Sequence, residues 1–170
     1  MGTTLEFYSA EPDKFVQIIA SDEDDAEDQI DVYPRADFSL HLLVSDMDTL
    51  CRVMRAQGIN VPNSFAELIG EKLWAEEDGS VFIARVPSTL APAMAKTSDA
   101  TIERIAAKWV SSYTVDPGEN LEEYTRTYSY AFRALSELRT VSQDALKRNR
   151  EVLLYCIGIE MMLPGWLYEP

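Results

Sequence analysis

The stretch that decides the fold is 120–158, NLEEYTRTYSYAFRALSELRTVSQDALKRNREVLLYCIG. Apolar and aromatic residues repeat there every seven positions in two columns, which predicts one long helix over about 121–149. The columns are Leu121, Tyr128 and Leu135, and Tyr124, Ala131, Leu138 and Ala145. Because Ser142 and Asn149 interrupt one column, we expect the helix to pack along the core of its own domain and not to form a coiled-coil dimer.

Three runs of β-favouring residues predict strands. The run 152–157 (VLLYCI) follows the long helix and ends at Gly158, and the run 4–9 (TLEFYS) lies near the start of the chain. The run 81–86 (VFIARV) is the clearest interior strand, and Pro87 stops it because proline has no N–H to donate. These runs do not alternate strictly with helices, so a doubly wound parallel sheet is disfavoured.

Shorter helices are predicted where a capping residue or proline precedes apolar residues at helical spacing. Their expected starts are Pro12, Ser45, Ser64, Thr89 and Ser98, and Asn120 with Glu123 caps the long helix. Their expected buried faces are Phe15, Ile18 and Ile19; Met47, Leu50, Cys51 and Met54; Phe65, Leu68, Ile69 and Leu73; and Ile102, Ile105, Ala106 and Trp109. The segment 37–44 (DFSLHLLV) is too short to separate a helix from a strand, and we favour a short helix.

Together these elements predict one compact α+β domain over residues 1–170. We expect a small sheet of three to four short strands packed by five to six helices, including the long helix near the C-terminus. The chain has 170 residues, of which 46% are hydrophobic, and this suits a single globular domain with its own core. A hydrophobic C-terminal tail, 159–170, follows the last strand.

Targeting and membrane signals are not recognisable in the sequence. The first residues lack the basic start and the apolar stretch of a signal peptide, and no apolar run approaches the roughly 18 residues of a membrane helix. Cys51 and Cys156 are far apart in apolar surroundings, which is typical of buried, reduced thiols. We therefore expect a cytoplasmic protein.

The overall charge restricts the kinds of partner. The chain carries 29 acidic and 15 basic residues, and its net charge is −14. Such a charge repels phosphate backbones and anionic lipids, so neither a nucleic acid nor a membrane is an expected partner. It suits docking to a basic protein, although acidic surfaces also serve simply to keep proteins soluble.

The segment 21–31 concentrates this charge and contains no base. Its carboxylates are Asp22, Glu23, Asp24, Asp25, Glu27, Asp28 and Asp31. Their mutual repulsion predicts a solvated acidic loop, and because the Gly and Glu positions of a calcium loop are absent, we expect no metal. The first six carboxylates are candidates for contact with a basic partner. Alternatively, the late basic residues Arg139, Lys147, Arg148 and Arg150 neutralise the segment within the fold.

His41 is the single histidine, so every histidine-dependent mechanism would have to use it. The sequence contains no G-x-S-x-G elbow, no phosphate-binding loop, no dinucleotide fingerprint and no Cys/His zinc pattern. We therefore expect no cofactor and assign no catalytic residue. The leucines around His41 favour a structural role for its imidazole, and the tyrosines within 124–130 favour helix packing over base stacking.

Several segments together resemble the YfbM-like family of small uncharacterised bacterial proteins. The stretch 31–41 (DVYPRADFSLH) is similar to the central motif of that family, with Ala36 where the family usually has Trp and Ser39 as an insertion. Matches in order and spacing extend over 1–158. The resemblance implies a compact α+β domain without established catalytic residues. It singles out a motif cluster of Arg35, Asp37 and His41.

Three functions are compatible with these features. The first is a protein-binding module, such as an immunity or regulatory protein that neutralises a basic partner. The alternative is an enzyme or a small-ligand-binding protein with a pocket near Arg35, Asp37 and His41. The third is self-association through the tail 159–170, which contains Met161, Met162, Trp166 and Tyr168. We favour the first, and we expect a monomer or a weak homodimer.

Overall fold

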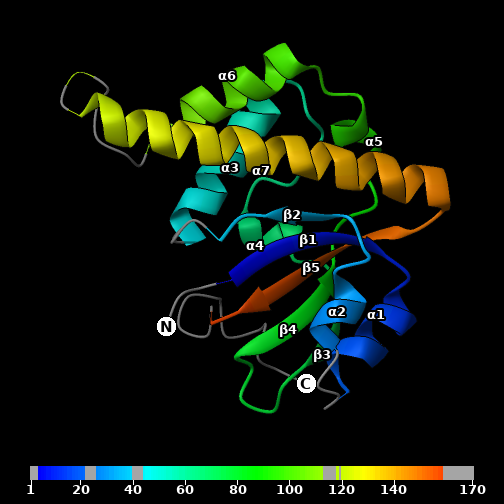
Figure 1. Ribbon diagram of the computed structural model, residues 1–170. Coiled ribbons are helices and arrows are strands. Elements are labelled where there is room, and N and C mark those ends of the chain that lie inside the picture. Colours follow the sequence, from blue (N-terminus) through cyan, green and yellow to red (C-terminus); the bar gives the residue numbers. More distant parts are fainter. Residues whose placement is uncertain (1–3, 22–25, 40–43, 113–117, 119, 159–170) are drawn as a thin grey trace.

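The computed structural model describes residues 4–21, 26–39, 44–112, 118 and 120–158. Within them, five antiparallel strands form one sheet in the order β2-β1-β5-β4-β3, and helices lie on both of its faces (Figure 1). The strands are β1 (Thr4–Ala10), β2 (Arg35–Asp37), β3 (Lys72–Ala75), β4 (Val81–Arg85) and β5 (Glu151–Ile157). The helices are α1 (Pro12–Ile19), α2 (Ala26–Ile30), α3 (Val44–Ala56), α4 (Phe65–Leu68), α5 (Leu90–Ala95), α6 (Asp99–Val110) and α7 (Leu121–Arg148).

The predicted α+β class and the predicted long helix are confirmed. The sheet, however, has five strands where three to four were expected, and the described residues form seven helices where five to six were expected. The two strands that the sequence did not indicate, β2 and β3, are the two edges of the sheet.

The short helix predicted over 37–44 is wrong at its start, because Asp37 belongs to the strand β2. The next residue continues the extended course, since the Phe38 N–H donates to the Leu5 carbonyl oxygen at 2.8 Å. Pairing with β1, thirty residues earlier in the chain, therefore decides the conformation here. The following helix, α3, already begins one residue before Ser45, so this serine lies inside the helix and does not cap it.

The helix predicted after Ser64 is shorter than expected, and β3 occupies its second half. Ser64 does cap α4, because its Oγ accepts a hydrogen bond from the N–H three residues on, but the helix ends at Leu68. Leu73, expected on the buried helix face, lies in β3. A tertiary contact intervenes: the Gly70 N–H donates to the Arg85 carbonyl oxygen at 2.8 Å, and a Cβ at Gly70 would lie 2.6 Å from that oxygen. Only glycine permits this approach.

Part of the predicted acidic loop is helical. Ala26–Ile30 forms α2, so the expectation of a loop over 21–31 is wrong for these residues, whereas 22–25 lies outside the described residues. Ile30 is partly buried against the smaller of the two cores described below. Because a helix this short is not stable by itself, we attribute α2 to this packing, which outweighs the repulsion between its carboxylates.

The long helix α7 runs across the sheet, and its first turns extend past the sheet edge (Figure 1). The expected cap is present, since Asn120 Oδ1 accepts a hydrogen bond from the Glu123 N–H at 3.1 Å. The helix ends at Asn149, whose φ of 53° is left-handed. Leu121, the first residue of one predicted column, is 67% exposed because it lies on the overhanging turns. The column residues that are buried as expected are Ala131, Leu135, Leu138 and Ala145.

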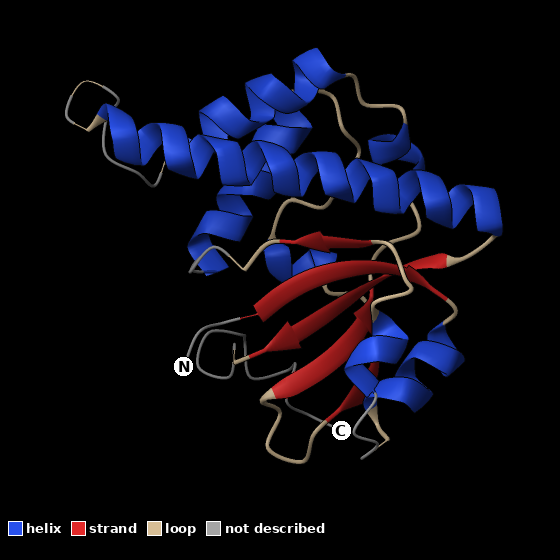
Figure 2. Ribbon diagram, viewed as in Figure 1, coloured by secondary structure: helices blue, strands red, loops and turns tan. Residues whose placement is uncertain are grey.

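Helices cover both faces of the sheet (Figure 2), and two hydrophobic cores join these layers. The larger core lies between one face of the sheet and α3, α4, α5, α6 and α7, and the smaller core lies between the other face and α1 and α2. Successive side chains of β1 alternate between them: Phe7 belongs to the larger core and Tyr8 to the smaller. Phe15 of α1 packs on the Tyr8 ring, with ring centroids 4.8 Å apart. The N-terminal segment therefore forms a layer of its own.

Two further expectations concern thiols and membrane helices. Cys51 and Cys156 are buried in the larger core, as predicted, and burial raises the pKa of each thiol to about 12. Neither therefore forms the reactive thiolate at neutral pH. No helix in the part of the chain that the structure describes is long and apolar enough to cross a membrane.

Candidate functional site

Acidic charge is concentrated in the N-terminal segment, which forms β1, α1, α2 and β2. Residues 1–37 contain eleven carboxylates and two bases, so they carry −9 of the total charge of −14. Residues 87–150, which form α5, α6 and α7, contain eight carboxylates and nine bases, so their net charge is +1. The N-terminal segment is therefore strongly acidic in its sequence, while the segment that forms α5, α6 and α7 is nearly neutral.

Only some of the sequence-predicted site residues lie within the described residues. Arg35 and Asp37 lie two positions apart on β2, so both point to the sheet face that α1 and α2 cover. Asp28 is an exposed residue of α2. The candidates Asp22, Glu23, Asp24, Asp25 and His41, and the tail 159–170, lie outside the described residues, and Glu27 is described only by its place in α2.

Glu6 lies beside Arg35 and Asp37 in the structure, although the sequence did not indicate it as a site residue. Glu6 on β1 lies directly opposite Asp37 on β2, which places two carboxylates in one cross-strand pair. Like charges in this arrangement repel each other. Arg35 is their nearby cation: its Nη1 lies 3.6 Å from Glu6 Oε1 and 3.6 Å from Asp31 Oδ1. We call the surface formed by Glu6, Asp28, Asp31, Arg35 and Asp37 the acidic face.

The electrostatic environment of Glu6 follows from its burial. Its side chain is 12% exposed, and loss of water raises the pKa of its carboxyl above the usual value. The Tyr8 hydroxyl, which donates to Glu6 Oε2 at 2.8 Å, and the Arg35 guanidinium oppose this shift only in part. Burial also raises the pKa of Tyr8, so its hydroxyl remains a donor at neutral pH. The charged form of Glu6 is thus incompletely compensated in the isolated protein.

Edge strand β2 is fixed firmly enough to hold this surface in place. The Asp37 N–H donates to Glu137 Oε2 of α7 at 3.2 Å, and Asp37 Oδ1 accepts from the Ser39 N–H at 2.8 Å. Ser39 Oγ in turn accepts from the Leu5 N–H at 3.1 Å. The positions of Glu6 and Asp37 are therefore set by the backbone and by α7.

The late basic residues do not neutralise the described part of the acidic segment. Arg139 Nη1 lies 2.6 Å from Asp99, and Arg148 Nε lies 2.8 Å from Asp144, so both pair within the helical layer. Arg150 pairs with Glu11 at 3.0 Å and lies 3.6 Å from Asp144. These three arginines therefore do not pair with Asp28 or Asp31, whereas the carboxylates of 22–25 lie outside the described residues and the interpretation stays a prediction for them.

Arg150 instead connects the two layers. It lies between Glu11 at the start of α1 and Asp144 on α7, and its guanidinium lies 5.2 Å from the centre of the Tyr33 ring. The buried Ser9 hydroxyl of β1 also donates to Asp144, at 2.8 Å. This network fixes both ends of the α1–α2 segment relative to α7.

The arrangement defines an α+β protein with helices on both faces of its sheet and with an acidic N-terminal segment. Among the described residues, no group of three or more His, Cys, Asp or Glu side chains is arranged to hold a metal ion. We found no significant match for this chain among protein-family models, curated proteins or solved structures. The resemblance to the YfbM-like family therefore stays a prediction.

Proposed function

We propose that this protein is a binding module for a basic protein, of the immunity or regulatory type, and that the acidic face is its docking surface. The observation that carries the proposal is the uneven charge of the segments, −9 in residues 1–37 against +1 in residues 87–150. A charge needed only for solubility has no reason to be concentrated in one segment of the chain. A one-sided field orients a basic partner during encounter and discourages wrong partners.

The composition of the acidic face supports this proposal. Val32, between Asp31 and the buried Tyr33, is 74% exposed and is the most exposed large hydrophobic residue of the described chain. Protein interfaces usually combine a dry apolar centre with a polar rim, and Val32 supplies an exposed apolar side chain next to Asp31 in the chain. The incompletely compensated charge at Glu6 adds a reason for a cationic partner, because a cation there would relieve the repulsion from Asp37.

Capture of partners from the native host tests the proposal. The protein is immobilised and exposed to host extract at about 100 mM salt, and retained proteins are identified by mass spectrometry. The test variant is Asp28→Asn with Asp31→Asn. The matched control is Glu103→Gln with Glu122→Gln, which removes the same charge from the exposed surface of α6 and α7.

The expected result is a basic protein that the wild type and the control variant retain and that the test variant retains at least tenfold less. Retention should also fall steeply when the salt is raised to about 500 mM, because exposed charges are then screened. Equal loss in both variants would mean that only net charge matters. Failure of wild-type protein to retain any basic protein would overturn the proposal.

A second candidate function is binding of a small ligand, or an enzymatic activity, near Arg35 and Asp37. The specific observation in its favour is Glu6, since a buried carboxyl with a raised pKa beside an arginine and a tyrosine is common at functional sites. Native mass spectrometry of the protein purified from its host separates the two functions. A retained small molecule, lost in Arg35→Ala, favours the ligand; a retained polypeptide favours the binding module.

A further inference from the structure

A cleft lies between the sheet and the helical layer, where β4 ends and β5 begins. Its volume is about 420 Å³, which is within the range of small-molecule and side-chain pockets. The residues that matter for its chemistry are Glu71, Arg85, Ala91, Leu146, Arg150 and Glu151.

The inner wall of the cleft is apolar. Val86, directly after β4, and Val152 of β5 line it and are almost fully buried. Leu146, on the last turns of α7, is 51% exposed at its side, and Ala91 contributes from α5. An aliphatic chain bound in the cleft would cover the exposed part of Leu146. Both apolar surfaces would then be removed from contact with water, which is favourable.

The rim of the cleft is charged, and each of its two arginines is paired with two carboxylates. Arg85 lies between Glu71 and Glu151, and its Nε is 2.6 Å from Glu151 Oε2. Arg150, the other cation of the lining, is shared by Glu11 and Asp144. The lining itself therefore carries two carboxylates and two guanidinium groups, and its formal charge is zero. Both guanidinium groups are already paired, Arg85 with the two glutamates and Arg150 with Glu11 and Asp144, so an incoming anion would have to compete with these carboxylates.

The rim also has acceptors to offer. Both contacts of Arg85 use the Oε2 atom of their glutamate, so each carboxylate keeps its other oxygen for a further donor. The side chains of Glu71 and Glu151 are 66% and 45% exposed, which leaves them accessible. The backbone below is fixed by the close contact of Gly70 with the Arg85 carbonyl oxygen, so the cleft exists before any ligand binds.

We infer that this cleft receives a lysine or arginine side chain of a basic protein partner. The aliphatic stem of such a side chain would lie along Leu146 on the apolar wall, and its cationic head would lie between Glu71 and Glu151 at the charged rim. Lysine and arginine side chains commonly bury their stems in this way and keep their charge in contact with water. The partner follows from the proposed function, whereas the chemistry of the cleft does not depend on it. Arg150 lines the cleft and also pairs with Glu11 at the start of α1, so the cleft adjoins the acidic N-terminal segment.

Titration with model compounds tests the chemistry of the cleft directly. The probes are n-butylguanidinium and n-butylammonium, which reproduce the ends of arginine and lysine, and binding is followed by the NMR signals of the Leu146 and Ala91 methyl groups. Guanidinium lacks the stem, and pentanoate carries the stem with the opposite charge. We expect dissociation constants of about 1–50 mM for the two alkyl cations, as is usual for so few atoms, and at least fivefold weaker binding of the two controls.

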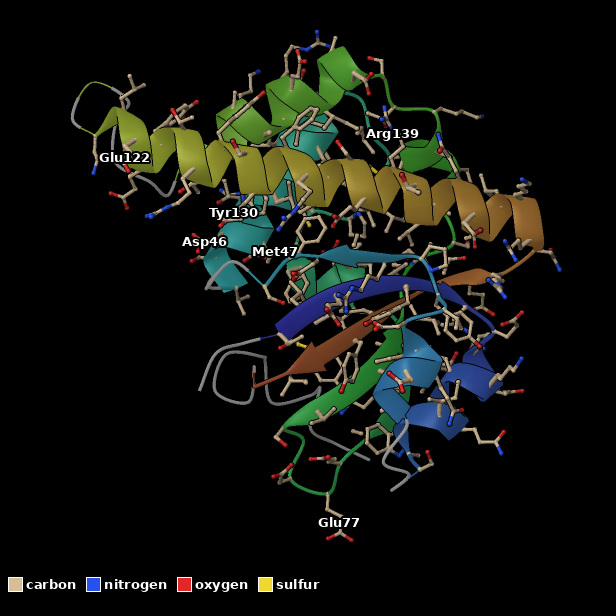
Figure 3. All side chains as sticks on the ribbon, viewed as in Figure 1. Asp46, Met47, Glu77, Glu122, Tyr130 and Arg139 are labelled. Carbon is tan, nitrogen blue, oxygen red and sulfur yellow. The ribbon has the colours of Figure 1, made fainter. Side chains whose placement is uncertain are left out.

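Matched variants assign the effect to the cleft. Glu71→Gln with Glu151→Gln should weaken binding at least threefold, as should Leu146→Ser. Glu77→Gln, at the turn between β3 and β4 where the side chain points away from the molecule (Figure 3), should leave it unchanged. Circular dichroism confirms that each variant is folded. The inference is overturned if the alkyl cations shift no cleft signal up to about 100 mM, or if pentanoate binds as well as they do.

The outcome is separable from that of the proposed function. If the host contains a basic partner but the probes do not bind, the cleft is excluded as a site for a cationic side chain, and the acidic face remains the proposed docking surface. If the probes bind and no partner is retained from the host, the cleft chemistry stands and the proposed function fails. If a partner is found, Leu146→Ser should reduce its retention at least threefold; unchanged retention would exclude the cleft from that interface.

Discussion

Ser142 of α7 offers a direct test of how the larger core is built. Its side chain is fully buried, and its Oγ has no hydrogen-bond partner among the described residues. Folding therefore takes this hydroxyl out of water without replacing its hydrogen bonds, and such a loss costs about 1–3 kcal/mol. The position belongs to the same seven-residue column as the buried Leu135, so the surroundings favour an apolar side chain.

We expect Ser142→Ala to raise the free energy of unfolding by about 1 kcal/mol. The substitution removes the unsatisfied hydroxyl, and alanine is the better helix former by roughly 0.5 kcal/mol. The small void that the Oγ leaves behind offsets part of this gain. For a chain of this size, a change of about 1 kcal/mol corresponds to a rise in Tm of about 2–4 °C.

Urea unfolding, followed by tryptophan fluorescence, measures the difference. The matched control is Ser136→Ala on the same helix, where the Oγ donates to the Phe132 carbonyl oxygen at 2.8 Å. This variant gains the same helix propensity but loses a hydrogen bond, so its free energy of unfolding should change little. The reasoning is refuted if Ser142→Ala destabilises the protein, or if both variants are stabilised equally.

Three other substitutions or modifications test the site and the cores. Because the pKa of Glu6 is raised in the folded state, its ionisation destabilises the protein as the pH rises; the stability of Glu6→Gln relative to wild type, from urea midpoints, should therefore increase between pH 4 and pH 7. Arg150→Met should lower the free energy of unfolding by about 2 kcal/mol in thermal unfolding, whereas Lys147→Met, on the exposed surface, should change it by less than about 0.5 kcal/mol. Cys51 and Cys156 should not react with a thiol reagent in the native protein but should both react in denaturant, because burial raises the pKa of each to about 12; fast reaction of the native protein would contradict their buried positions.

Local signals in the sequence were sufficient to predict those helices that contain their own capping residue and a clear apolar periodicity. The helix α6 follows from the Ser98 cap, whose Oγ accepts from the Thr101 N–H, and from an apolar face in which Ile102 and Trp109 are fully buried. The same is true of α7, where both the cap and the seven-residue repeat are local features. In each case the residues that stabilise the element lie within it.

The edge strands could not be predicted in the same way. β2 has three residues and β3 has four, which is too short for an alternating pattern to be distinguished from a loop or a helical turn. Their conformations depend on partners in β1 and β4, which lie elsewhere in the chain. Each of the segments that was wrongly predicted as helix overlaps one of these strands.

The site was predictable to the same limited extent. The motif pointed to Arg35 and Asp37, and the composition pointed to the acidic segment, because both are local features of the sequence. Glu6 was missed because its role depends on the pairing of β1 with β2. The alternation along β1 places Glu6 on the same face as Tyr8, but only the register shows that Asp37 lies opposite.

The salt dependence of stability and binding distinguishes two roles of the N-terminal carboxylates, docking of a partner and stabilisation of the fold. The carboxylates of residues 1–37 repel one another, and the smaller core beneath α1 and α2 has six buried residues among those that the structure describes, so screening should favour the folded state of the free protein. Ion pairs such as those of Arg148 act in the opposite sense, but exposed pairs contribute little.

Raising the salt from about 0.1 M to about 1 M shortens the screening length from about 10 Å to about 3 Å. We expect the urea midpoint of the free protein to rise over this range while retention of a basic partner falls. If the acidic residues served the fold through internal ion pairs, the urea midpoint would fall with salt instead. Opposite responses of stability and binding are the result that only a docking role for the N-terminal carboxylates predicts.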